Sequence, residues 1–510
     1  MVAHNPLNSP PVGTRDQLNW QLASLSDYGD KDDPSIPTGA YWQQAIWWEP
    51  IRAALEGTQY IRANAARYLP QNTLELDDSW QGRVSRSVYT PLVNRVMRVA
   101  TGLILRKPIQ LDGDAFWTDT FQNDVDRMGT PLSEFVRNQL FLSIAYGSSS
   151  WLVDFPTGEG IRTLRDQQEA QLQPYFVPVD PWSIIGWRQD PRTMAGKLTQ
   201  LRIKEVCEVP KGKFGTELKQ RVRVMSPDSW TVYEKQDDGP VTWVPIEEGK
   251  NALGEIPLVT AYSNKIGTLF AKPPLGELAQ LNHAYTRVHS DLQQALHIAA
   301  QPILVMAGYD PSPDDKVGLS VNNAICTGPR GESEIYYVEP SVNSFESQRA
   351  ELEGLANAIK SLGLAILTEE KSGVESAKAK ALDRMDSNST LSVISIQLEQ
   401  ALQQAFDLAG QYMGIEPPVV AIDRDFDVAE VDGQKMAAVN TLFTSGLLDQ
   451  ETALGILKRG ELFDDTVEIE EIMARAETEQ LQSMEQEMEK LEMQTEIAAA
   501  NAPVKPAPKG

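Results

Sequence analysis

Three long helical segments between residues 274 and 415 constrain the fold of this chain more than any other feature. Their apolar residues recur at alternating steps of three and four, a spacing that keeps one seam of a helix facing a partner. At about 1.5 Å of rise per residue each segment is about 35–40 Å long, well above the usual globular helix. The segments cover residues 274–300, 346–367 and 387–413, and their seams consist of Leu278, Leu281, Tyr285, Val288, Leu292, Ala295 and Ala299, then Leu352, Leu355, Ile359, Leu362 and Ile366, then Leu391, Ile394, Leu398, Ala401, Ala405, Leu408 and Tyr412.

Helices with matching seams need a surface to pack on. Either they pack on one another inside one chain, as in an ordinary helical bundle, or they pack on copies of themselves in an assembly. The spacing alone favours neither arrangement, so both stay open at this point.

Composition limits the class of protein. The chain has 510 residues, enough for two to four domains and a large core, and 41% of them are apolar. Cys207 and Cys326 form no CxxC pair, which argues against a disulfide framework or a zinc site and fits a reducing compartment. The first residues lack a basic region followed by an apolar one, so we expect no signal peptide. No run of 18 apolar residues occurs, so we expect no membrane-spanning helix.

The charge of the chain is strongly negative. The net charge of −25 argues against a protein that coats nucleic acid through a basic surface. It leaves room for a protein that surrounds DNA without gripping it. Residues 421–510 carry 20 acidic and 8 basic side chains, so nearly half of the negative excess lies in this stretch.

The first half of the chain predicts one α+β domain. Residues 1–40, rich in Pro, Asn, Ser, Asp and Gly, are expected to form an irregular arm. Helices are predicted over 41–67, 84–105 and 131–146. Between 149 and 262, short alternating runs broken by Gly, Pro and Asp-Gly predict an antiparallel sheet. Helices and strands segregated in this way are typical of an α+β domain.

A small strand-bearing unit separates the first two long segments. The runs "QPILVMAGYD" from residue 301 and "SEIYYVEP" from residue 333 each predict a strand. Because this unit lies between two long helices, its two ends must lie together at one tip of a helical hairpin. After the third long segment we expect the strand "VVAI", shorter helices, an acidic helix near 465–498 and a disordered tail.

Signatures of catalysis are missing from the sequence. It contains no GxxxxGK[ST] loop and no GxGxxG after a strand. The stretch "YGSSSW" at 146–151 lacks the second glycine of a GxSxG nucleophile elbow. We therefore expect no enzyme and no catalytic residue.

Metal-ligand patterns fail as well. His283, His289 and His297 fall on different faces of one helix and cannot share a metal, so we expect them on the helix surface or at an interface. The "DRDFD" run at 423–427 opens like a calcium loop but has Val and Gln where that loop needs Gly and Glu. We expect no metal and no cofactor.

The segment 368–386 mixes lysines with acids and has a net charge of only −1 in a strongly acidic chain. One interpretation is a plain solvated linker. The other is a mobile loop that presents lysines to a phosphate backbone, for which lysine is suited because it acts as a point charge without reading bases. The basic residues concerned are Lys371, Lys378, Lys380 and Arg384.

The order of these elements resembles the portal, or head-to-tail connector, proteins of tailed double-stranded DNA bacteriophages. Each stretch that carries the resemblance is weak alone, but their order is fairly specific, and together they cover most of residues 60–470. The stretches are "YLPQ" (68–71), "GLILRKP" (102–108), "YGSSSWLVDFP" (146–156), "GEIPLV" (254–259), "PPLGELAQLNHAYTRVHSDL" (273–292), "QPILVMAG" (301–308) and "DRDFDV…GLLDQETALGILKRG" (423–460).

The resemblance implies a mainly helical α+β fold with the parts of a portal, assembled as a ring. The implied parts are an N-terminal arm (1–40), a wing (41–265), a first stem helix (266–301), a clip (302–340), a second stem helix (341–367), a tunnel loop (368–386), a core helix (387–415), a crown (416–498) and a disordered tail (499–510).

The resemblance also implies a function. A ring of about twelve copies would sit at the capsid vertex of the virion, after assembly in the host cytoplasm, and genomic double-stranded DNA would be packaged and ejected through it. Its partners would be the major capsid protein, the large terminase subunit and a head–tail adaptor or neck protein, with no membrane involved. The acidic balance suits a channel, because each phosphate contact adds salt-dependent affinity and drag.

Three groups of residues receive roles from the resemblance. The basic residues of 368–386 would face non-specific DNA in the channel. The clip would dock its partners, and the long helices would supply part of the ring interface. The clip residues concerned are Asp310, Asp314, Lys316, Arg330 and Glu332, and the interface residues are Leu278, Leu281, Tyr285, Leu292, Leu391 and Leu398.

Two other classes of protein compete with this interpretation. A coiled-coil scaffolding or adaptor protein with an added α+β domain would form dimers or trimers and enclose no DNA. The strand-bearing unit between two long helices argues against it, because a coiled coil has no need of one. A nucleotide-driven motor is disfavoured by the missing phosphate loop.

Overall fold

The fold is described from a computed structural model, which divides the chain into two compact units, Met1–Phe426 and Asp427–Gly510. The described residues of the second unit are 440–445 and 478. Those of the first are 33–73, 75–156, 172–190, 197–236, 242–299, 303–307, 334–338, 342–367 and 377–424, with the backbone alone described at 298–299, 303–307, 334–338, 342–344, 364–367 and 377–389.

The N-terminal helices are more broken than the sequence predicted. The single helix expected over 41–67 is three: α2 (Gly39–Glu56), α3 (Thr58–Ala63) and α4 (Ala65–Tyr68). Gly57 separates the first two with a φ of 71°, a conformation that favours glycine.

The helix expected over 84–105 is two, α5 (Asp77–Arg86) and α6 (Leu92–Ile104). Pro91 lies between them and disfavours helical backbone at the preceding residue. The helix expected over 131–146 is present as α7 (Leu132–Tyr146). It ends at Gly147, whose φ is 91° and where an added Cβ would lie 2.8 Å from the carbonyl group of Lys272.

The region 149–262 contains the predicted antiparallel strands, in two sheets. One is three-stranded in the order β3-β2-β9, and the other is five-stranded in the order β4-β5-β6-β7-β8. The strands are β2 (Ser148–Asp154), β3 (Tyr175–Val179), β4 (Ile184–Gln189), β5 (Leu198–Lys211), β6 (Gly215–Met225), β7 (Ser229–Gln236), β8 (Thr242–Lys250) and β9 (Leu258–Tyr262). A short pair, β10 (Lys265–Gly267) and β11 (Phe270–Ala271), follows.

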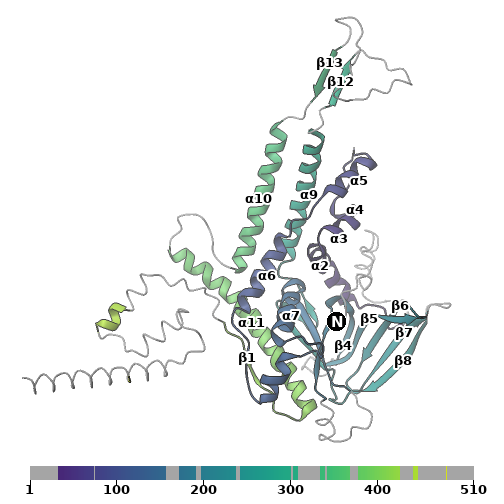
Figure 1. The fold of residues 1–510 in the computed structure, drawn as a ribbon, viewed down its shortest axis with the longest axis vertical. Coiled ribbons are helices and arrows are strands. Elements are labelled where there is room, and N and C mark those ends of the chain that lie inside the picture. The colour runs from purple at the N-terminus through teal and green to yellow at the C-terminus, as the bar shows by residue number, and fades with distance from the viewer. Residues whose placement is uncertain are drawn as a thin grey trace, which may run out of the picture. The chain divides into compact units, whose positions relative to one another are not determined.

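The long helical segments form a projecting hairpin and a helix at its base (Figure 1). Helix α9 (Gly276–Ala299) runs away from the sheets and α10 (Val342–Leu367) returns beside it. At the tip, β12 (Ile303–Ala307) pairs antiparallel with β13 (Glu334–Val338), as the sequence predicted. Helix α11 (Ala377–Met413) then packs against β9 and β2.

One core joins the sheets, the N-terminal helices and α11. Trp117, Phe121, Phe176 and Phe406 are fully buried and their rings meet mostly edge to face at centroid distances of 5.2–5.9 Å. Such contacts add about 0.5–1.5 kcal/mol per pair to the gain from burial. The core therefore ties residues near 117 to residues near 406.

A strand that follows α11 closes this core. β14 (Val419–Ala421) pairs antiparallel with β1 (Gln110–Asp112), and the indole Nε1 of Trp117 donates a hydrogen bond to the carbonyl oxygen of Glu416 at 2.9 Å. Residues 416–424 therefore belong to the first unit, which corrects their assignment to a crown beginning at residue 416.

Candidate functional site

The base of the α9–α10 hairpin has the most detailed set of contacts among the elements to which the sequence gave a role. Asn282 of α9 is fully buried. Its Oδ1 accepts from the hydroxyl of Tyr89 at 2.7 Å and from the backbone N–H of Val93 at 3.1 Å, and its Nδ2 donates to the carbonyl oxygen of Thr90 at 3.0 Å. One amide thereby holds α9 to the connection between α5 and α6.

A second polar contact joins α5 to the outer half of α9. Arg83, which is 3% exposed, pairs with Glu75 at 2.8 Å and with Asp291 at 3.2 Å, and donates to the hydroxyl of Ser290 at 3.3 Å. The hydrogen bonds from Arg83 lower the pKa of Glu75 despite burial. Burial raises the pKa of Asp291, which is more exposed and farther from the guanidinium.

We expected the three histidines of α9 on the helix surface or at an interface. His283 is buried inside the chain and does not lie on the surface. Its Nε2–H donates to the carbonyl oxygen of Pro50 at 2.8 Å, and its ring packs between Tyr68 and Tyr89 at centroid distances of 4.8 and 5.9 Å. Burial lowers the pKa of His283, and the nearby charges of Arg287 and Arg67 lower it further.

Helix α10 approaches the body through α6. Gly363 lies against Val96, and a Cβ added at 363 would be 2.7 Å from a methyl group of that valine. One turn earlier, Ile359 is 1% exposed and belongs to the main core, together with Leu391 and Ile394 of α11. The hairpin, α6 and α11 therefore meet at one crossing, which fixes where the hairpin leaves the body.

The residues predicted to form a ring interface are instead packed within a single chain. Leu278, Leu292, Leu391 and Leu398 are between 1% and 6% exposed, and Leu281 and Tyr285 pack half-buried against the same core. Between the two arrangements that the seams left open, the structure has helices packed on one another and on the body. The four leucines are thus not available for contacts between copies.

The stretch 368–386, predicted as a tunnel loop, is helical in its last ten residues, 377–386. Helix α11 begins at Ala377, ten residues before the start predicted for it, so Lys378, Lys380 and Arg384 stand on its first turns. Lys371 lies outside the described residues. The low helix propensity expected of a Ser-Gly hinge at 372–373 does not extend into the Ala-Lys repeat that follows.

The predicted clip residues Asp310, Asp314, Lys316, Arg330 and Glu332 all lie outside the described residues. The structure describes the backbone of β12 and β13, which brings the two sides of this segment together at the end of the hairpin (Figure 1).

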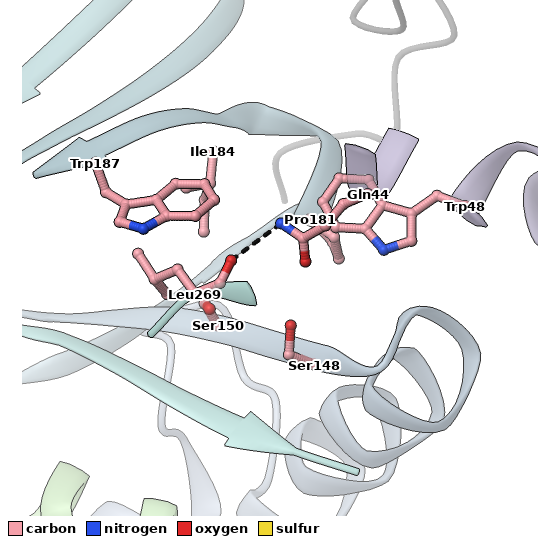
Figure 2. A pocket seen from close by; sticks show the side chains of 8 residues that line it. All are labelled: Gln44, Trp48, Ser148, Ser150, Pro181, Ile184, Trp187 and Leu269. Atoms are coloured by element: carbon pink, nitrogen blue, oxygen red, sulfur yellow. Dashed lines mark hydrogen bonds between the residues drawn. The ribbon is translucent and has the colours of Figure 1, made fainter. Parts of the chain in front are cut away.

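The serines of "YGSSSW" lie on the buried strand β2. They do not occupy a strand-to-helix turn, which is where a nucleophile elbow places its serine. Ser148 and Ser150 line a cavity of about 10 Å³ with Gln44, Trp48 and Trp187 (Figure 2), room for about one water molecule. Gln44 donates to the carbonyl oxygen of Leu269 at 3.0 Å beside it. This cavity is too small for a substrate.

The described residues hold no group of three or more His, Cys, Asp or Glu that could bind a metal ion. None of the described helices is both long and apolar enough to cross a membrane.

One surface that the sequence interpretation missed lies on α6. Val93, Met97 and Ala100 face the core, so Arg95, Arg98 and Val99 point to solvent. The signal was available in the sequence as two arginines three positions apart on the polar side of an apolar helix. The sequence interpretation missed this surface because it predicted one helix over 84–105 and assigned no exposed face to it.

Comparisons with known proteins give one family match and several distant structural likenesses. A family model described as "Domain of unknown function (DUF4055)" matches residues 274–413, the stretch that holds the hairpin and α11. No curated protein matches the chain.

The structural likenesses are to chains of gene transfer agent (GTA) particles. A chain of the "Neck of native GTA particle computed with C12 symmetry" is 9% identical with a TM-score of 0.37, and covers 78% of this chain and 93% of that chain. A chain of the "Virion of native gene transfer agent (GTA) particle" is 10% identical with a TM-score of 0.37 and the same coverage. A chain of the "Neck of empty GTA particle computed with C6 symmetry" is 11% identical with a TM-score of 0.39, covering 78% and 98%. At these values we draw no functional argument from the likeness.

Proposed function

We propose that the chain is a phage portal protein: a non-enzymatic subunit of a ring at the capsid vertex, through which double-stranded DNA passes and on which the packaging motor and then the neck proteins dock. The observation that carries the proposal is the order of elements. An α+β body is followed by a long helix, a two-stranded tip, a returning helix and a further long helix. This is the order on which the resemblance in the sequence rests.

The structure supports this proposal over the coiled-coil adaptor. A coiled-coil adaptor needs its apolar seams free to pair with another copy. In this chain the seam residues Leu278, Leu292 and Leu398 are 4%, 6% and 1% exposed within a single subunit. A subunit with filled seams would have to assemble through other faces, as a ring of heterologous contacts does.

The test is negative-stain imaging of the purified full chain together with mass determination in solution. A ring with a central hole, at about twelve times the subunit mass, is the expected result. A compact dimer or trimer without a hole would contradict the proposal and favour the adaptor. Added ATP should not be turned over, because a motor is the other class that the proposal excludes.

A further inference from the structure

The exposed face of α6 is a basic surface with an apolar centre. Arg95 and Arg98 are exposed and Val99 is 43% exposed. Together with Pro91 and Asn94 they line an open hollow of about 450 Å³. Among the described residues, neither arginine forms an ion pair. This hollow, here called the α6 hollow, is thus a positive surface whose arginines have no ion-pair partner in the described part of a chain with a net charge of −25.

A second surface has the opposite character. Leu76, directly before α5, is 78% exposed, and the first two residues of α5, Asp77 and Asp78, are exposed beside it. We call these three residues the α5 knob. Its base is rigid, because Arg83 and Gln294 tie α5 to α9 through the contacts with Glu75, Asp291 and Ser79.

The two surfaces lie on different sides of the hairpin. Helix α5 packs along α9 on the side away from α10, whereas α6 lies beside α10 (Figure 1). The α6 hollow carries two positive charges around an apolar centre, and the α5 knob carries two negative charges beside an apolar side chain. Because the two surfaces match in charge and chemistry but belong to different faces, a contact between them joins successive copies head to tail.

We propose that the α5 knob of one copy docks into the α6 hollow of the next, with Leu76 against Val99 and the aspartates facing Arg95 and Arg98. This inference rests on the proposed function, since it names the surfaces that would join neighbouring subunits. A contact of this type is heterologous and forms a closed ring when its rotation closes.

A second copy of this chain fits the hollow better than DNA does. A phosphate backbone is bound by charge and polar groups and gains nothing from a central valine and proline. Protein interfaces, in contrast, are enriched in arginine around an apolar centre. The same chain also supplies a matching acidic partner surface, which needs no further component.

The first experiment is a charge exchange in the full chain, with mass determination and imaging as above. We expect Arg95→Glu/Arg98→Glu to lower the fraction of chain in rings at least about tenfold, because both attractions become repulsions. Asp77→Arg/Asp78→Arg should do the same. A chain that carries all four changes should assemble again, since the exchanged charges still match. The matched control is Glu247→Arg/Glu248→Arg, two adjacent exposed acids on β8.

The four-change variant distinguishes a contact from a folding defect. Asp77 and Asp78 stand in the first turn of α5, where the helix dipole favours negative charge, so their reversal weakens α5 by itself. That weakening cannot be repaired by changing α6. Restored rings therefore support the contact. If each two-residue variant loses the ring and the four-change variant does not restore it, the pairing is overturned. The pairing is also overturned if either two-residue variant forms rings at the wild-type yield.

A second experiment uses cross-linking. In a background with Cys207→Ser and Cys326→Ser, Leu76→Cys/Val99→Cys should give a ladder of disulfide-linked multimers under oxidising conditions, and neither single cysteine should give one. A wild-type ring without this ladder would overturn the inference and leave the proposed function standing. A wild-type chain that forms no ring would contradict the proposed function itself. A third outcome is that Arg95→Glu/Arg98→Glu forms rings at the wild-type yield but binds double-stranded DNA more weakly. That result would assign the hollow to DNA and overturn the proposal.

Discussion

Asn282 shows how much a single side chain contributes to the position of the hairpin. Replacing it with Ala removes three hydrogen bonds and leaves the Val93 N–H and the Thr90 carbonyl group without the partner they have in the buried site. We expect the free energy of unfolding to fall by about 3 kcal/mol, measured by urea denaturation followed by tryptophan fluorescence. Asn357→Ala, at an exposed position of α10, is the control and should change it by less than about 0.5 kcal/mol.

His283 predicts a pH dependence of stability. Its pKa is lowered in the folded state by burial, so the unfolded chain takes up the proton first as the pH falls below the ordinary value of about 6.5. The contribution of His283 to stability is therefore full at pH 7.5 and decreases between about pH 6.5 and its lower folded-state pKa.

The measurement for His283 is the melting temperature at pH 7.5 and at pH 5.5. We expect His283→Gln, which keeps a donor for the Pro50 carbonyl group, to lose less of its melting temperature between these values than the wild type. His289→Gln, half-buried on the same helix, should behave as the wild type does. An equal loss in all three proteins would contradict the assignment to His283.

At the residue scale, the sequence predicted which side chains make apolar contacts better than it predicted which groups they contact. The seam spacing correctly marked Leu278, Leu292, Leu391 and Leu398 as apolar contact residues. It could not say that their contacts lie within the chain, because periodicity defines the apolar face of a helix and not what covers it. For the same reason, the position of His283 on a helix with many polar residues gave no indication that it is buried against Pro50.

Among the elements, the crossing of α6 and α10 depends on a single glycine. A Cβ at Gly363 would lie 2.7 Å from a methyl group of Val96, closer than real contacts allow. We expect Gly363→Ala to destabilise the chain by about 1–3 kcal/mol through overpacking. Adding Val96→Ala should recover part of the loss, because it removes the methyl groups in the way.

Gly354 provides the matched control for this crossing. It lies on the same helix, and an added Cβ there would meet nothing within 4 Å. Gly354→Ala should therefore stabilise α10 by about 0.5–1 kcal/mol through helix propensity alone. Opposite signs for the two substitutions, measured by thermal unfolding, would show that packing and not propensity governs position 363.

The order of elements was more predictable than their ends. Both long hairpin helices, the two tip strands and the antiparallel sheet region appear where periodicity and turn residues predicted them. The breaks at Gly57 and Pro91 were missed, although both residue types commonly interrupt helices. The pairing of β1 with β14 left no local signal, because three-residue strands carry too little pattern and their partners are far apart in the sequence.

For the whole molecule, the proposed function predicts that DNA contact and assembly are separable. Replacing Lys371, Lys378 and Lys380 together by Ala should impair DNA packaging or retention in particles, because non-specific phosphate contacts depend on lysine charge. Ring formation by the purified chain should be unchanged, since none of these lysines belongs to the proposed contact between copies. Normal packaging by the triple variant would remove these lysines from the DNA path.

The closure of the body by β14 has a consequence for the time at which a subunit becomes complete. The hydrogen bond from Trp117 to Glu416 spans 299 positions, and loops of this length close slowly compared with local contacts. During synthesis, β14 cannot cover the aromatic core around Trp117 until the chain beyond Ala421 has left the ribosome. A nascent subunit therefore keeps this core incomplete for most of its synthesis. The last described strand of its first unit, β14, is the one that completes it.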